Sequence, residues 1–88
     1  MSETPENRLK RLNMRSWRRG TKEMDLILGP YADAHLAGMD APELAAFEAF
    51  LDENDSDLLP WITGAAPTPP QHVAMIDRLR AFATARHG

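Results

Sequence analysis

Residues 21–36, TKEMDLILGPYADAHL, decide the fold of this chain. Apolar or ring-bearing side chains recur there every three or four residues, and they are Met24, Ile27, Leu28, Tyr31 and His35. That spacing places them on one face of an α-helix. Thr21 can cap the start of the helix, and Pro30 falls inside it, where its ring predicts a kink. The stretch therefore predicts a core helix from Thr21 to about Leu36.

Capping signals on either side predict two more helices. Thr4-Pro5 can open a first helix that runs to about Arg18, because threonine caps free amides and proline lacks only an N–H that has no helical partner there. The residues Asp40-Ala-Pro-Glu43 resemble a capping box, and a third helix follows them to about Glu53. Asn54 suits a left-handed stop for that helix.

A short fourth helix and a last helix complete the pattern. Residues 55–57 (Asp-Ser-Asp) offer caps for the fourth helix, which Gly64 closes. A start at Asp57 would place Pro60 in the first turn, whereas a start at Asp55 would lose one backbone hydrogen bond. Residues 65–70 form a Pro-rich linker before a C-terminal helix over 71–86. We therefore predict an all-α fold, one compact five-helix bundle domain over residues 1–88 with a four-helix core at about 5–64.

The composition agrees with a small helical domain and limits its chemistry. The chain has 88 residues, of which 43% are apolar and 26% are charged, and it has no cysteine. The lack of cysteine excludes disulfides and thiolate metal sites. No stretch approaches the ~18 apolar residues that span a membrane, so we expect no membrane insertion. Glu3 and Glu6 argue against an arginine-rich mitochondrial presequence, and we expect a bacterial cytoplasmic protein.

Charge is distributed very unevenly along the chain. Residues 8–22 hold seven of the ten basic residues and no acid, whereas residues 23–57 hold ten acids and neither lysine nor arginine. Either the basic first helix packs on the chain's own acidic helices, or it presents a basic surface to a partner. The sequence leaves both alternatives open.

Signatures of enzymes and metal sites are missing from the sequence. There is no Gly-rich phosphate loop, no nucleophile elbow and no helical histidine pair with a glutamate. The acids between Asp52 and Asp57 lack the spacing of a calcium-binding loop, and helix caps explain them better. We therefore expect no catalytic residue and no metal ligand.

The segment Arg18-Arg19-Gly20-Thr21-Lys22-Glu23 is the most informative for function. Gly20 lies between two predicted helices, where the lack of a Cβ allows a tight turn and the close approach of another backbone. Arg19 and Glu23 flank this turn and can face a partner. In the alternative interpretation, Gly20 is only a helix stop and Arg19 forms an exposed ion pair with Glu23 that contributes little.

This segment also carries a family resemblance. The pattern Arg19-Gly20-x-x-Glu23, with Trp17-Arg18 before it and Met24-Asp25 after it, resembles the R-G-x-x-E motif of the FAD assembly factors, called SdhE in bacteria and succinate dehydrogenase assembly factor 2 in mitochondria. Further similar positions, over roughly residues 8–64, are Pro30-Tyr31, Asp57-Leu58 and Trp61. Pro60 departs from the family pattern and puts the geometry of the fourth helix in doubt.

The resemblance implies a chaperone-like factor and not an enzyme. Such a factor binds the flavoprotein subunit of succinate dehydrogenase, and often that of fumarate reductase, and promotes covalent attachment of FAD to a histidine of that partner. It has no cofactor of its own, because the FAD belongs to the partner. The expected partner-binding residues are Trp17, Arg18, Arg19, Gly20, Glu23, Asp25, Tyr31 and Trp61.

A nucleic-acid-binding helical domain is the second hypothesis. Its basis is the basic first helix, on which Trp17 could stack against bases. The net charge of -3 and the acidic middle of the chain argue against it.

Overall fold

The computed structural model describes residues 3–87, and the side chains of residues 3–85. Five helices follow one another, α1 (Pro5–Trp17), α2 (Lys22–His35), α3 (Ala41–Leu51), α4 (Asp55–Thr63) and α5 (Val73–His87). Single 3-10 turns, Leu36–Gly38 and Pro70–His72, follow α2 and precede α5. The described part of the chain contains no strand, so the predicted all-α, five-helix fold is confirmed.

Local capping explains why most helices begin where they do. The Thr4 hydroxyl accepts from the Asn7 amide at 3.1 Å, and the Thr21 hydroxyl accepts from the Met24 amide at 3.4 Å. Asp40 and Glu43 form both bonds of the predicted capping box. These side chains satisfy amides that a helix start would otherwise leave without partners.

The connection between α3 and α4 differs from the prediction. Asn54 has φ -77° and ψ 144°, which is extended backbone and not the left-handed stop expected there. It serves as the N-cap residue of α4, which begins at Asp55, and α3 ends at Leu51 instead of near Glu53. Pro60 therefore lies inside α4, where it cannot donate a hydrogen bond to the Ser56 carbonyl.

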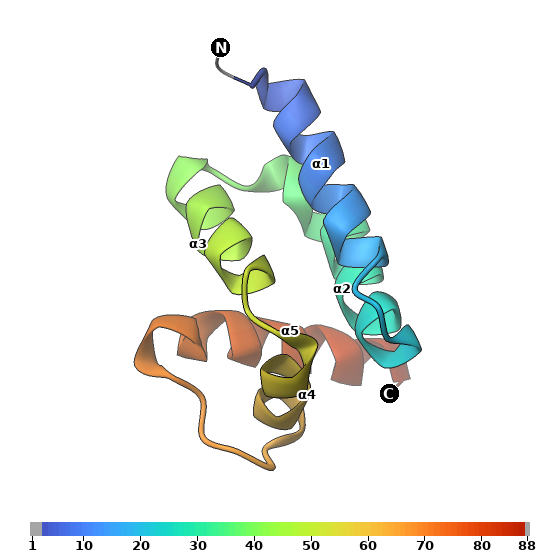
Figure 1. The fold of residues 1–88 in the computed structure, drawn as a ribbon, viewed down its shortest axis with the longest axis vertical. Coiled ribbons are helices and arrows are strands. Elements are labelled where there is room, and N and C mark those ends of the chain that lie inside the picture. Colours follow the sequence, from blue (N-terminus) through green and yellow to red (C-terminus); the bar gives the residue numbers. More distant parts are fainter. Residues whose placement is uncertain (1–2, 88) are drawn as a thin grey trace.

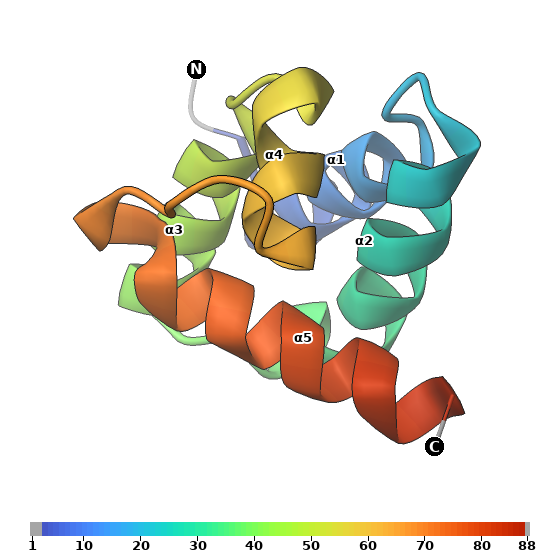
Figure 2. The ribbon, with the colours of Figure 1, turned by 90° about the horizontal axis from the view of Figure 1, so that it is seen from below.

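Helices α1 and α2 lie side by side, and α3, to their left in Figure 1, contacts α1. Helix α5 crosses beneath them and contacts α2, α3 and α4, as the view from below shows (Figure 2). The C-terminal helix thus closes the base of the molecule. The buried residues form one cluster, to which every helix contributes, and they include Leu12, Leu28, Phe47, Leu58 and Leu79.

Two aromatic residues expected at a partner surface lie in this core. Tyr31 is 4% exposed and packs near the rings of Phe47 and Phe82, at centroid distances of 6.1 and 5.5 Å. Trp61 is 9% exposed and stacks on His72 at a centroid distance of 5.6 Å. Their burial assigns both rings a structural task. Among the described residues, no helix combines the length and the apolar character needed to cross a membrane.

Candidate functional site

The turn between α1 and α2 is built around Gly20. This residue has φ +104°, a conformation that residues with a Cβ rarely adopt. Apart from Gly20 and its two chain neighbours, no described atom lies within 4 Å of the place that a Cβ would occupy, so the backbone is open to the outside at this point. The Arg19 amide donates to the Asp25 carboxylate at 2.6 Å, which ties the turn to the first turn of α2. The result is a fixed turn with an accessible backbone.

Arg19 points inward from this turn. Its Nη1 and Nη2 atoms donate to the carbonyls of Leu51 at 2.6 Å and Glu53 at 2.7 Å, and its Nε donates to the Asp55 carboxylate at 2.9 Å. The side chain is only 10% exposed. A cation at the C-terminus of α3 satisfies carbonyls that the helix leaves free. Arg19 therefore joins the end of α3 to the start of α4, which neither sequence interpretation anticipated.

Residues 18 and 20–23 are exposed at this turn. Three of them are predicted partner-binding residues, Arg18, Gly20 and Glu23, and we call these three the turn surface. Glu23 lies in the first turn of α2 and is exposed. Arg19 pairs with Asp55, and not with Glu23 as the alternative interpretation predicted. The predicted residues Trp17, Arg18, Arg19, Gly20, Glu23 and Asp25 are thus gathered around one turn. Within that group, Arg19 and Asp25 are partly buried and hold the turn in place, whereas the other four residues are exposed.

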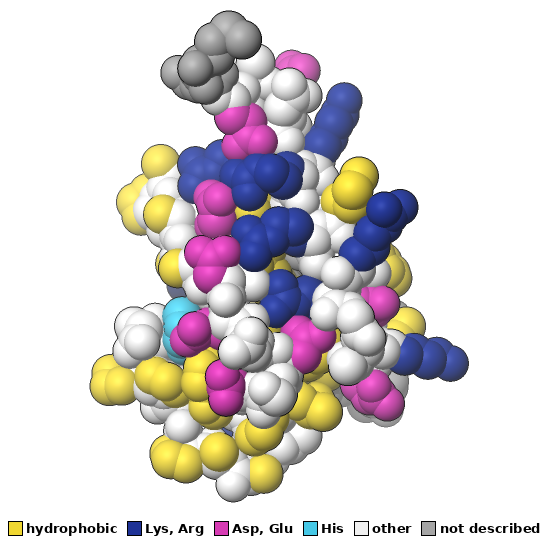
Figure 3. All heavy atoms as spheres, viewed as in Figure 1, with side chains coloured by type: hydrophobic (Ala, Val, Ile, Leu, Met, Phe, Trp, Pro, Cys, Tyr) yellow, Lys and Arg dark blue, Asp and Glu magenta, His cyan; other side chains and the backbone are white. Residues whose placement is uncertain are grey.

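Three of the basic residues of α1 pair with acidic residues of α3 and of its C-terminal end. Arg8 and Arg11 pair with Glu48 at 3.0 and 2.8 Å, and Arg15 pairs with Asp52 at 2.9 Å. Figure 3 shows basic and acidic side chains interleaved down one face of the molecule. Much of the basic helix therefore faces the chain's own acids, which weakens the basis for a nucleic-acid-binding surface.

These ion pairs shift the pKa values of their acids. The Arg11 hydrogen bond, with help from Arg8, holds the pKa of Glu48 below its ordinary value, despite the opposing effect of desolvation. A hydrogen bond from Arg11 also lowers the pKa of Glu3. Both carboxylates therefore remain charged to lower pH than free ones would.

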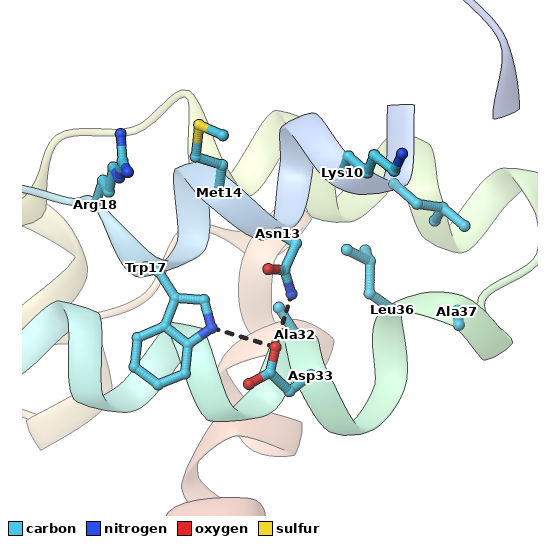
Figure 4. Close-up of a pocket in the computed structure, with 10 residues that line it drawn as sticks. Lys10, Asn13, Met14, Trp17, Arg18, Ala32, Asp33, Leu36 and Ala37 are labelled. Atoms are coloured by element: carbon cyan, nitrogen blue, oxygen red, sulfur yellow. Dashed lines mark hydrogen bonds between the residues drawn. The ribbon is translucent and has the colours of Figure 1, made fainter. Parts of the chain in front are cut away.

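A groove between α1 and α2 begins beside the turn surface (Figure 4). Its volume is about 600 Å³, and its lining consists of Leu9, Lys10, Asn13, Met14, Trp17, Arg18, Ala32, Asp33, Leu36 and Ala37. Asn13 and the Trp17 indole both donate to the Asp33 carboxylate, at 2.8 and 3.2 Å. These two hydrogen bonds lower the pKa of Asp33, with that of Asn13 having the larger effect.

Gly29 makes the position of Trp17 possible. A Cβ at residue 29 would lie well inside van der Waals contact with the atoms of the Trp17 ring. The indole therefore rests directly on the backbone of α2. This contact, like the bonds to Asp33, was missed from the sequence, although the i, i+4 spacings Asn13–Trp17 and Gly29–Asp33 could have suggested facing pairs.

Comparison with known proteins identifies the family. The family model described as "Flavinator of succinate dehydrogenase" matches residues 10–83. The chain belongs to this family. The match extends through most of α5, beyond residues 8–64, where the sequence resemblance was strongest.

Several relatives of this flavinator family are named succinate dehydrogenase assembly factor 2, mitochondrial. The Aspergillus terreus protein is 46% identical over 57 residues, which is 65% of this chain and 19% of that protein. The Drosophila grimshawi protein is 39% identical over 67 residues, covering 74% of this chain and 46% of that protein. A Drosophila melanogaster protein, factor 2-B, is 37% identical over 76 residues, covering 84% and 49%. The chain thus spans from about a fifth to about half of the length of these relatives.

The family model is described as a flavinator, and the relatives named above are called assembly factors. The described residues contain no cluster of three or more potential metal ligands. Tyr31 and Trp61, which carried part of the resemblance, lie in the core and away from the turn surface. The partner-binding assignments themselves stay predictions. The exposed candidates are Arg18, Gly20 and Glu23, with Trp17 beside them at 38% exposure.

Proposed function

We propose that this chain binds the flavoprotein subunit of succinate dehydrogenase and promotes covalent attachment of FAD to it, without being an enzyme. Membership of the flavinator family supports the proposal. The FAD and the histidine that it joins belong to the partner, and this chain holds no cofactor. The flavoprotein of fumarate reductase is a second partner of the same kind. The expected location remains the bacterial cytoplasm, although the relatives named above are labelled mitochondrial.

The open Gly20 backbone is the observation that carries this proposal. A partner segment can approach it without meeting a side chain, and Glu23 beside it can accept charge-assisted hydrogen bonds. Arg19 and Asp25 hold the turn rigid from behind. A rigid surface of this kind can fix a mobile part of the flavoprotein so that flavin and histidine stay in attack geometry. The chain then contributes orientation and supplies no reacting group.

In-gel flavin fluorescence of the flavoprotein subunit after denaturing electrophoresis tests this function. Cells with this gene are compared with cells that lack it or carry Gly20→Arg, and fluorescence should fall in the last two. Gly38→Arg is the matched control, because position 38 also has open space around a Cβ but no positive φ. The control should leave fluorescence intact.

A second variant separates binding from folding. Glu23→Ala removes an exposed carboxylate and should weaken flavinylation while leaving the circular dichroism of the purified domain unchanged. Unchanged fluorescence in cells without the gene would overturn the function. Loss of fold in Glu23→Ala would instead assign this residue a structural role.

A further inference from the structure

We propose that the groove between α1 and α2 is a second docking surface, which receives an amphipathic helix of the flavoprotein partner with carboxylates beside its apolar face. The proposal rests on the function proposed above and adds a site to it. The groove is continuous with the turn surface, because Arg18 belongs to both. One partner can therefore cover both regions at once.

Exposed apolar side chains give the groove its affinity for an apolar face. Met14 is 53% exposed and Trp17 is 38% exposed, and both line the groove together with Leu36. Large apolar groups gathered in a hollow of about 600 Å³ gain free energy when a partner removes them from water. Two neighbouring helices form the walls, which is the shape that receives a third helix.

Trp17 is already fixed in the conformation that it would present. Its ring lies on Gly29, and its indole N–H is held by Asp33. A side chain that is ordered before binding loses little further conformational entropy, and such aromatic anchors carry much of the binding energy at interfaces. The groove is therefore pre-organised around an aromatic anchor.

Two cations mark the ends of the groove and identify the kind of helix that fits. Lys10 lies near the middle of α1 and Arg18 directly follows its last residue, with Met14 between them (Figure 4). Among the described side chains, no carboxylate lies within ion-pair distance of either, in contrast to Arg8, Arg11 and Arg15. Eight residues of helix separate them by about 12 Å. A partner helix with carboxylates about two turns apart therefore matches both cations.

Binding of the purified flavoprotein subunit, lacking covalent FAD, tests the groove. Met14→Ser should weaken binding about 10-fold, since it removes an exposed apolar side chain from the lining of the groove. Leu26→Ser is the matched control, because Leu26 is also 53% exposed but does not line the groove, and its affinity should stay within about 2-fold. Lys10→Ala should weaken binding several-fold and reduce its dependence on salt.

A photo-crosslinking residue at position 14 identifies the occupant. Crosslinks to a flavoprotein helix with acidic residues beside its apolar face would support the proposal. Crosslinks to a second copy of this chain, or to a partner segment without acids, would overturn it. If Met14→Ser and Lys10→Ala bound with wild-type affinity while Gly20→Arg lost binding, the groove would not be a docking surface. The proposed function would stay intact. If the wild-type chain failed to bind the flavoprotein, both ideas would fall.

Discussion

The Arg19 guanidinium connects the α1–α2 turn to the end of α3 and the start of α4. It donates to the carbonyls of Leu51 and Glu53 and to the carboxylate of Asp55, and little of it reaches solvent. Arg19→Ala removes these bonds and leaves their acceptors partly buried. We expect the free energy of unfolding to fall by about 3 kcal/mol, because half-satisfied buried groups carry their desolvation cost. Urea denaturation followed by circular dichroism measures the change.

Arg18→Ala provides the comparison for Arg19, since the neighbouring arginine is exposed. Its effect on stability should be within about 0.5 kcal/mol. Arg19→Lys should fall between the two, because lysine keeps the charge and loses the planar fork of donors. If Arg19→Ala proved as stable as Arg18→Ala, the inward position of Arg19 would be wrong. If Arg19→Ala is destabilised as expected, a loss of flavinylation in this variant is explained by a loosened α3–α4 connection.

Gly29 is a second residue whose role depends on one contact. Alanine is the better helix former by about 1 kcal/mol, so helix propensity predicts that Gly29→Ala is stabilising. Its Cβ would meet the Trp17 ring, however, and overpacking of this kind costs about 1–3 kcal/mol. We therefore expect a net loss of stability in thermal unfolding. The double variant Gly29→Ala with Trp17→Ala should lose less than the two single variants added together, and strict additivity would contradict the contact.

At the scale of the elements, ion pairs between α1 and α3 make stability depend on pH. The folded-state pKa of Glu48 lies below its ordinary value of 4.5, mainly because of Arg11. A lowered pKa stabilises the fold above the unfolded-state pKa, and that stabilisation is lost as the pH falls through the folded-state pKa. We expect the free energy of unfolding to decrease from about pH 5 downward.

Glu48→Gln tests this dependence, since it removes the titrating group with little change of shape. Urea unfolding of the variant should show a shallower decrease below pH 5 than that of the wild type. The difference should shrink in concentrated salt, because the pair is partly exposed and therefore screened. Identical pH profiles for the two proteins would show that this pair contributes nothing measurable.

Helix starts could be predicted from the sequence where the signal is local. Thr4, Thr21 and the Asp40 capping box each act within one turn, and the structure contains all three caps. The start of α4 was less certain, because several polar residues in the connection can cap a helix. In the structure Asn54 occupies the N-cap position without a side-chain capping bond, and it follows Glu53, whose carbonyl Arg19 binds from more than thirty residues away. Long-range contacts of that kind leave no periodic trace in a sequence.

The same reasoning applies to the candidate site. The turn at Gly20 was predictable, because a glycine between two helical patterns is a local signal, and its positive φ agrees. The burial of Tyr31 and Trp61 depends on which helices pack together, and a motif match does not contain that information. The division of the α1 cations into paired and unpaired groups likewise depends on where α3 packs.

At the scale of the whole molecule, α5 is part of the single core and not an appendage behind the linker. Its Met75, Ile76 and Leu79 are at most 5% exposed and join the same cluster as the residues of the other helices. Burial of three such side chains contributes about 5–9 kcal/mol. The net stability expected for 88 residues, after the conformational entropy cost of folding, is about 4–13 kcal/mol. Loss of the α5 burial therefore removes a contribution comparable to the whole margin.

A chain cut after Ala66 should therefore fail to fold, although it keeps α1 to α4 and the whole turn surface. We expect poorly dispersed amide resonances and no cooperative urea transition, because the remaining core leaves its base exposed to water. A synthetic peptide of residues 67–88 added in trans should restore dispersion, since it returns the missing apolar face. If the shortened chain unfolded cooperatively without the peptide, α1 to α4 would form an autonomous domain. Flavinylation should follow folding in this series, being lost on truncation and recovered with the peptide, because the turn surface depends on α3 and α4 staying in place.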